Sequence, residues 1–237
     1  MEKILLAALI LLFSCTTQPD FKESSLMMQP TDEAGVLAPI DRSKSDAYLQ
    51  TSAILLDFDG HNVNSPYWNG GVPFTCAPSG LSPAQIDSIR GIIYINLIRE
   101  VGLNIFVMTS SYGLGKYNLL PDSQKIRIVI TTTSAWRPGV SGTAYTNSFG
   151  LGIEGFVFSN IVTNVSDISQ IILHEFGHTA GLRHQSVWEN GVKIDEYRLG
   201  VTEGNPIGTS GGWIVGLNSI GDLQDDTLKL QQTIGTR

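Results

Sequence analysis

The segment HEFGHTAGLRH, which begins at His174, holds three of the four histidines in the chain. On a helix, His174 and His178 stand four positions apart, so both imidazoles project from one face and can chelate one ion. Glu175 is rotated by about 100° from His174, which places its carboxylate beside that ion and outside its ligand shell. Gly181 is typical of a helix end in a left-handed turn, after which the chain can fold back and present His184 as a third ligand. The spacing predicts a zinc site.

The predicted ligand set indicates which chemistry this site could carry out. Three neutral ligands leave the fourth position of a tetrahedral zinc ion open for water, as in catalytic zinc sites. The ion lowers the pKa of that water to about 7. Glu175 can then take the proton and later pass it to a leaving amine. We therefore expect metal-assisted hydrolysis of amide bonds.

The sequence also predicts the helices and strands that would position these residues. Ser166 and Asp167 are typical capping residues for a helix that carries the histidines. Ser82, Pro83 and Gln85 predict the start of an earlier helix whose apolar stripe runs to Val101. Apolar or strand-forming runs predict strands at Ala53–Phe58, Asn104–Thr109, Ile126–Thr131, Gly142–Thr146 and Gly155–Ser159, and a last helix is expected over Asp222–Gln232. The pattern favours an α/β fold with a mostly parallel sheet.

At every position of its motif, HEFGHTAGLRH resembles the metzincin clan of zinc peptidases. The resemblance implies His174, His178 and His184 as ligands and Glu175 as general base. It also implies a twisted, mostly parallel five-stranded sheet with an antiparallel edge strand, a zinc-site helix and a small C-terminal subdomain. Weaker similarities to secreted bacterial metzincin-like peptidases lie in AILLDFDGH, Tyr67-Trp68-Asn69, PIGTSGGW and LQDDTLKL.

The same resemblance suggests where a substrate would lie. In such enzymes the edge strand before the zinc helix pairs with an extended peptide, and main-chain pairing tolerates many sequences. Here that strand would be formed by Gly142, Thr143, Ala144 and Tyr145. The alternative is an ordinary edge strand with no such role.

One part of the metzincin pattern is missing from this chain. Metzincins carry a methionine in a turn beneath the zinc, but all four methionines here precede His174. The segment Pro206-Ile207-Gly208 resembles that turn without its methionine, and Ile207 could supply part of the apolar floor. Tyr197 is a candidate oxyanion donor in place of a tyrosine that some relatives carry, although loop tyrosines more often serve packing.

Four further residues invite functional interpretations. Asp57 and Asp59 could bind calcium, but an acidic pair more often ends a strand and caps a turn, and the spaced acidic loop of a calcium site is absent. For His61 we expect a hydrogen-bonding loop role. Cys76 fits a free structural thiol, with silencing of the metal as the alternative.

The N-terminus predicts export. MEK, the apolar run Ile4–Phe13 and then Ser14 and Cys15 are typical of a signal peptide over residues 1–14, and the run is too short to span a bilayer. Leu12–Cys15 resembles a lipobox in which Cys15 becomes lipidated, while a plain signal peptide is the alternative. Residues 15–50 are polar and fit a flexible tether, and residues 51–237 form the predicted peptidase domain.

The charge of the chain limits which classes of molecule it is expected to bind. The net charge is -7 and no run of basic residues occurs, which argues against nucleic acid and leaves the lipid anchor as the membrane contact. We expect a monomeric, exported zinc endopeptidase at a bacterial outer membrane, on its periplasmic face or the cell surface, acting on peptides or proteins. The alternative is a zinc-containing but catalytically weak surface lipoprotein that binds peptide or host ligands.

Overall fold

The computed structural model describes residues 51–182, 187–189, 192–195 and 226–236. Several predicted features lie outside these residues: the signal segment 1–14, Cys15, the tether to residue 50, His184, Tyr197 and the turn Pro206–Gly208. They remain sequence-based predictions.

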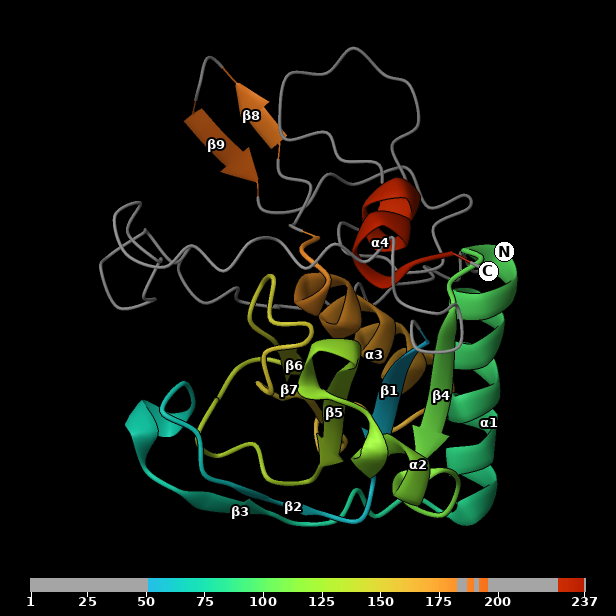
Figure 1. Cartoon of the computed structure of the whole chain (residues 1–237). Coiled ribbons are helices and arrows are strands. Elements are labelled where there is room, and N and C mark those ends of the chain that lie inside the picture. The colour runs from blue at the N-terminus through green and yellow to red at the C-terminus, as the bar shows by residue number, and fades with distance from the viewer. Residues whose placement is uncertain (1–50, 183–186, 190–191, 196–225, 237) are drawn as a thin grey trace, which may run out of the picture.

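A five-stranded sheet forms the centre of the fold, in the order β4-β1-β5-β7-β6 (Figure 1). Its strands are β1 (Ser52–Asp57), β4 (Ile105–Thr109), β5 (Lys125–Thr131), β6 (Gly142–Thr143) and β7 (Gly155–Phe158). The fully buried β1 pairs in parallel with β4 and β5, and β5 pairs in parallel with β7. Only β6 at the edge runs antiparallel, with Gly142 opposite Val157. The mostly parallel sheet with an antiparallel edge strand confirms the predicted fold class.

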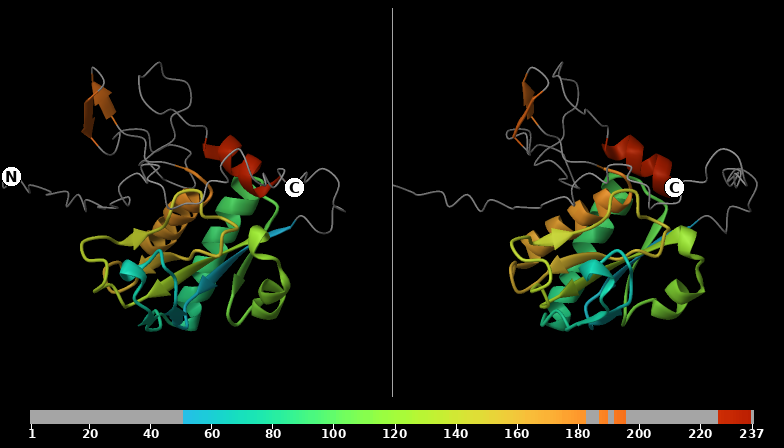
Figure 2. Two further views of the ribbon diagram at one scale, coloured as in Figure 1. Left: turned by 60° about the vertical axis from the view of Figure 1, so that its left-hand side comes forward. Right: turned by 90° about the vertical axis from the view of Figure 1, so that its left-hand side faces the viewer.

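Helices α1 (Pro83–Tyr94) and α3 (Val165–Thr179) pack side by side on one face of the sheet (Figure 2). A π-helical segment, η4 (Ile95–Glu100), continues α1. Apolar side chains of both helices and of alternate strand positions make the largest core, which includes Ile54, Leu56, Ile89, Ile93, Leu97, Ile128, Ile130, Ile172 and Phe176. Because α3 belongs to this core, its packing against the sheet fixes the position of the histidine-bearing helix.

Short elements cover the opposite face of the sheet. They are α2 (Leu114–Leu119), the antiparallel pair β2 (His61–Val63) and β3 (Phe74–Cys76), and the 3-10 turns η3 (Asn69–Gly71) and η5 (Asp122–Gln124). Tyr117 of α2 packs with Ala53, Leu55 and Met108. A second, aromatic-rich cluster on this face contains Trp68, Cys76, Val129, Phe156 and Phe158. The two faces of the sheet therefore have separate cores.

The last helix, α4 (Asp226–Ile234), joins the core on the α1–α3 face through Leu230 and Ile234. Thr236 forms a bridge with Leu103, which ties the end of the chain to the entry of β4. The strands β8 (Val187–Glu189) and β9 (Val192–Asp195) form a separate antiparallel pair. Among the described helices, none has the length and apolar character needed to cross a membrane.

The structure corrects three element boundaries. The helix with the histidines begins at Val165, capped by Asn164, whose side chain accepts a hydrogen bond from the backbone N–H of Asp167 at 2.8 Å. Asn is as good a cap as Ser, so the sequence offered two starts. Strand β6 ends at Thr143, not at Thr146, and α4 runs on to Ile234. The capping box of α1 between Ser82 and Gln85 is as predicted.

Candidate metal centre

Two of the three predicted ligands meet on one face of α3. The rings of His174 and His178 lie nearly perpendicular, with centroids 4.6 Å apart, and their Nε2 atoms are 3.1 Å apart. His178 is 1% exposed and Glu175 is fully buried. The helix thus directs two imidazole nitrogens toward one point, as the four-residue spacing predicts.

The end of α3 fixes the protonation of one imidazole. Gly181 has φ +97°, its N–H donates to the carbonyl of His178 at 2.8 Å, and the N–H of Leu182 donates to the carbonyl of Gly177 at 2.9 Å. This pair of bonds is the Schellman motif, which glycine permits because it has no Cβ. The turn brings the carbonyl of Leu182 to 2.8 Å from Nδ1 of His178. A carbonyl only accepts, so Nδ1 carries the proton and Nε2 is the unprotonated nitrogen of the neutral ring, facing His174.

This arrangement fits a zinc ion. Zinc–nitrogen bonds of about 2.0–2.1 Å in a tetrahedron separate two ligand nitrogens by about 3.3 Å, and the two Nε2 atoms are 3.1 Å apart. Metal-binding histidines commonly donate their other N–H to a carbonyl, as His178 does. Within the described part of the chain, no group of three or more His, Cys, Asp or Glu residues could hold a metal ion. The predicted third ligand, His184, lies outside that part.

The loop after β6 is attached to the same helix end. The N–H of Asn147 donates to the carbonyl of His178 at 3.0 Å, and the N–H of Phe149 donates to that of Thr179 at 2.8 Å. The bond to Thr179 satisfies a carbonyl that the last turn of a helix leaves unpaired, and the bond to His178 gives its carbonyl a second donor beside Gly181. Asn147 adopts φ +63°, an uncommon conformation for a residue other than glycine. The chain after the edge strand is therefore held in register with the histidines.

Strand β6 also approaches the glutamate of the motif. At Gly142, an added Cβ would stand 2.6 Å from Oε1 of Glu175 and 2.7 Å from Cγ2 of Ile171. The carboxyl group of Glu175 therefore lies directly against the backbone of the edge strand. The candidate site therefore includes a strand that lies about thirty residues before the histidine motif in the sequence.

The predicted substrate strand lies at the edge of the sheet, as expected. Gly142, Thr143 and Ala144 are buried, while Tyr145 is half-buried. The hydroxyl of Tyr145 donates to the carbonyl of Tyr67 at 2.7 Å, and burial raises the pKa of this phenol. Pairing of these residues with a peptide stays a prediction.

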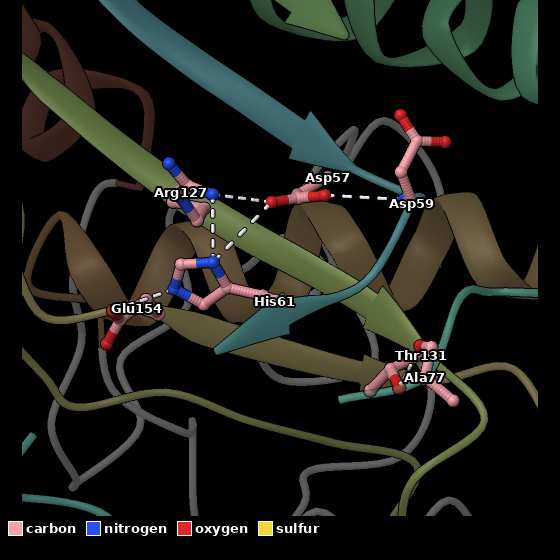
Figure 3. Close-up of polar contacts among 7 residues, drawn as sticks. All are labelled: Asp57, Asp59, His61, Ala77, Arg127, Thr131 and Glu154. Atoms are coloured by element: carbon pink, nitrogen blue, oxygen red, sulfur yellow. Dashed lines mark hydrogen bonds and ion pairs between the residues drawn. The ribbon is translucent and has the colours of Figure 1, made fainter. Parts of the chain in front are cut away.

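A second polar cluster lies on the opposite face of the sheet (Figure 3). The guanidinium of Arg127 contacts Oδ2 of Asp57 at 2.5 Å and donates to Nδ1 of His61 at 3.0 Å. Nε2 of His61 lies 3.2 Å from Oε1 of Glu154. Because a guanidinium only donates, Nδ1 of His61 accepts and its Nε2–H donates to Glu154. Both ring nitrogens of His61 are engaged, which agrees with a hydrogen-bonding role.

The acidic pair near this cluster acts as a strand end. Oδ1 of Asp57 accepts a hydrogen bond from the backbone N–H of Asp59 at 3.3 Å, and its other oxygen faces Arg127 (Figure 3). Since the guanidinium already neutralises this carboxylate, it offers little to a calcium ion. The geometry supports the capping interpretation over calcium binding.

Cys76 and the two histidines of α3 lie on opposite faces of the sheet. Cys76 is buried in the aromatic-rich core on the face away from α3, opposite His61 in the β2–β3 ladder. Burial raises the pKa of its thiol to about 11. The structure does not bring Cys76 to His174 and His178, so it fits the structural thiol and not a silencing ligand.

Sequence reasoning missed three parts of this centre. They are the Leu182 carbonyl, the bonds from the loop at Asn147, and the contact between Gly142 and Glu175. Gly181 followed by an apolar residue is a signal for the Schellman turn, and a lone glycine in a strand is a signal for close backbone approach. Neither signal says which distant residue will be the partner.

Comparisons with known proteins give only distant similarities. No protein-family model matches the chain, and no curated protein matches it. A solved chaperone–substrate complex has 13% identity and a TM-score of 0.39, and the match covers 78% of this chain and 38% of that one. The crystal structure of myroilysin, a metallopeptidase, has 14% identity and a TM-score of 0.34, covering 78% and 82%. The chain thus spans 38% of the length of the first structure, and neither similarity establishes a family.

Proposed function

We propose that this chain is an exported, zinc-dependent endopeptidase that hydrolyses peptide bonds. The observation that carries the proposal is the convergence of the Nε2 atoms of His174 and His178 at 3.1 Å, with the lone pair of His178 fixed by its bond to Leu182. Glu175 follows the first of these residues and is buried against the edge strand. In this proposal His184 completes the ligand set.

The roles of the chain's residues follow from their chemistry. When bound, the zinc ion supplies a water molecule with its pKa lowered to about 7 and polarises the carbonyl to be attacked. Glu175 accepts the proton and then donates it to the leaving amine. Its burial excludes competing water and strengthens its electrostatic interactions. Gly142–Tyr145 would hold the peptide by main-chain hydrogen bonds, which requires no fixed side-chain sequence.

The setting of the activity is part of the proposal. Residues 1–14 would direct export, and lipidation at Cys15 would hold the protein at a bacterial outer membrane, on the periplasmic face or the cell surface. Residues 15–50 would then act as a tether between the membrane and a monomeric catalytic domain. The substrate class is peptides and proteins outside the cytoplasm.

Cleavage of an unfolded protein by the purified, zinc-loaded chain tests the proposal. We expect Glu175→Ala to keep one zinc ion per chain and to lower kcat by about 10²–10⁴-fold, because only the proton transfer is removed. Chelation should abolish cleavage in both proteins. His61→Ala is the matched control, since this histidine belongs to the cluster on the other face of the sheet.

Two outcomes would contradict the proposed peptidase activity. One is equal cleavage by the intact chain and by Glu175→Ala, which would mean a contaminating activity. The other is a zinc-loaded chain that cuts no peptide of a diverse library. The second outcome would favour a zinc-containing surface lipoprotein that binds peptide or host ligands, an alternative supported by the absence of a methionine after His174.

A further inference from the structure

The glycine at position 142 is not required by the conformation of the backbone. Most glycines in the described part of the chain have positive φ, where other residues are strained, but Gly142 and Gly155 lie in ordinary extended strands. A glycine inside a strand weakens it, since it contributes no side chain to packing. A glycine at this position is therefore explained by the lack of room for a side chain.

The space left by Gly142 is filled mainly by Glu175. A Cβ there would stand 2.6 Å from Oε1 and 2.9 Å from Cγ of that side chain, closer than real Cβ contacts allow. The remaining one of the three nearest atoms is Cγ2 of Ile171, one turn earlier on α3, at 2.7 Å. At Gly155, in contrast, the close atom is Cδ1 of Ile128, the end of an apolar side chain. The two strand glycines thus make room for different chemistry.

We infer that Gly142 is a positioning residue for Glu175, so that the strand proposed to hold the peptide also sets the place of the proposed base. The inference rests on the proposed function. The Cβ direction at Gly142 points toward α3, so a methyl group there would leave the N–H and C=O groups of β6 in place. The methyl group would instead move the carboxyl group.

The size of that movement determines the expected effect. A general base must lie within about 2.6–3.2 Å of the proton it takes, and a misplacement of about 1 Å costs on the order of 10²-fold in rate. Gly142→Ala should therefore lower kcat by about 10–100-fold, with little change in KM and with one zinc ion per chain retained. A purely structural role would not separate kcat from KM in this way.

A cycle of four proteins tests the contact without relying on activity. The zinc-loaded full chain, Gly142→Ala, Glu175→Ala and the double variant are compared by thermal unfolding. Overpacking at Gly142 should lower Tm by roughly 3–6 °C in the intact chain. In the Glu175→Ala background the loss should be at most half as large, because two of the three nearest atoms belong to the side chain that this substitution removes. Gly155→Ala, the matched control, should lower Tm equally in both backgrounds.

Each result decides the inference. Coupling in Tm together with the fall in kcat supports it. Equal Tm losses in both backgrounds overturn it, because the clash would then lie with Ile171 alone. Unchanged kcat in Gly142→Ala also overturns it, even if the Tm values are coupled. If the intact chain cleaves nothing, the proposed function fails by that result, while the Tm cycle still decides whether Gly142 holds the carboxyl group.

Discussion

His178 and His61 occupy opposite faces of one sheet and differ in what their ring nitrogens can still do. His178 donates from Nδ1 to the Leu182 carbonyl, which leaves the lone pair of Nε2 directed at the space shared with His174. His61 accepts from Arg127 at Nδ1 and donates to Glu154 from Nε2, so neither nitrogen is left for an ion.

The difference shows how the same residue type becomes a ligand or a structural group. A backbone carbonyl engages Nδ1 of His178 while its Nε2 faces the neighbouring imidazole of His174, whereas side chains that carry charge engage both nitrogens of His61. On the α3 face, the proposed zinc ion would complete the arrangement of His174 and His178. On the other face, Arg127 pairs with Asp57 and Glu154 accepts from His61, so these side chains occupy both nitrogens of that ring.

Removal of the guanidinium should have the largest effect on stability. In Arg127→Met, the carboxylate of Asp57, whose side chain is only 6% exposed, loses its cation. We expect a loss of about 2–3 kcal/mol in the free energy of unfolding, measured by urea titration. Zinc content should be unchanged, because the cluster lies across the sheet from α3.

The double variant Asp57→Leu/Arg127→Met controls for this effect. Replacement of both partners by apolar groups should recover most of the lost stability. Loss of zinc in Arg127→Met, with the protein still folded, would contradict the independence of the two histidine clusters.

Gly181→Ala should have a smaller effect on stability but a larger one on the metal. The left-handed φ of +97° strains any other residue by about 1–2 kcal/mol, and the new methyl group would also collide with the side chain of Asn147. Since the turn carries the Leu182 carbonyl that orients His178, zinc affinity should fall by about 10–100-fold. Isothermal titration with zinc measures this.

Gly139→Ala is the matched control, because Gly139 has φ +84° and open space around an added Cβ. It should lose similar stability and keep its zinc affinity. Equal zinc affinities for the two variants would show that the turn at Gly181 does not orient the ligand.

Alkaline pH should give the smallest change. Burial raises the pKa of Cys76 from 9.0 to about 11 and that of Tyr117 from 10.0 to about 12. Above pH 9 the unfolded chain releases these protons before the folded chain does, so stability falls as the pH rises toward 11 and 12. Urea midpoints at pH 8, 9 and 10 should decline, and less steeply in Cys76→Ala/Tyr117→Phe. An unaltered slope in that variant would contradict the assignment to these two groups.

The sequence predicted the elements that carry a strong local pattern. The apolar runs of β1, β4 and β5 and the capping box of α1 were placed within a residue or two, because buried strands and capped helices leave signals in neighbouring residues. The short pair β2 and β3 escaped prediction, since three residues show no period. The sequence did not single out Asn164 as the N-cap of α3, because Ser166 and Asp167 are residue types that also favour this position.

The site was predictable only as far as its chemistry is local in sequence. His174, Glu175, His178 and Gly181 lie within eight positions, and helical geometry relates them. The pair of Asp57 and Arg127 is separated by 70 positions, and Gly142 meets Glu175 only because sheet order brings β6 beside α3. Contacts of this kind depend on topology, which residue spacing does not encode.

Zinc stoichiometry is the measurement that tests the central claim most directly. The purified intact chain, His178→Ala and His61→Ala are saturated with zinc, freed of excess metal and assayed for bound ion, with circular dichroism to verify folding. We predict one ion per chain for the intact protein and for His61→Ala, and none retained by His178→Ala. Retention of the ion by folded His178→Ala, or its loss from folded His61→Ala, would contradict the assignment of the metal centre to α3.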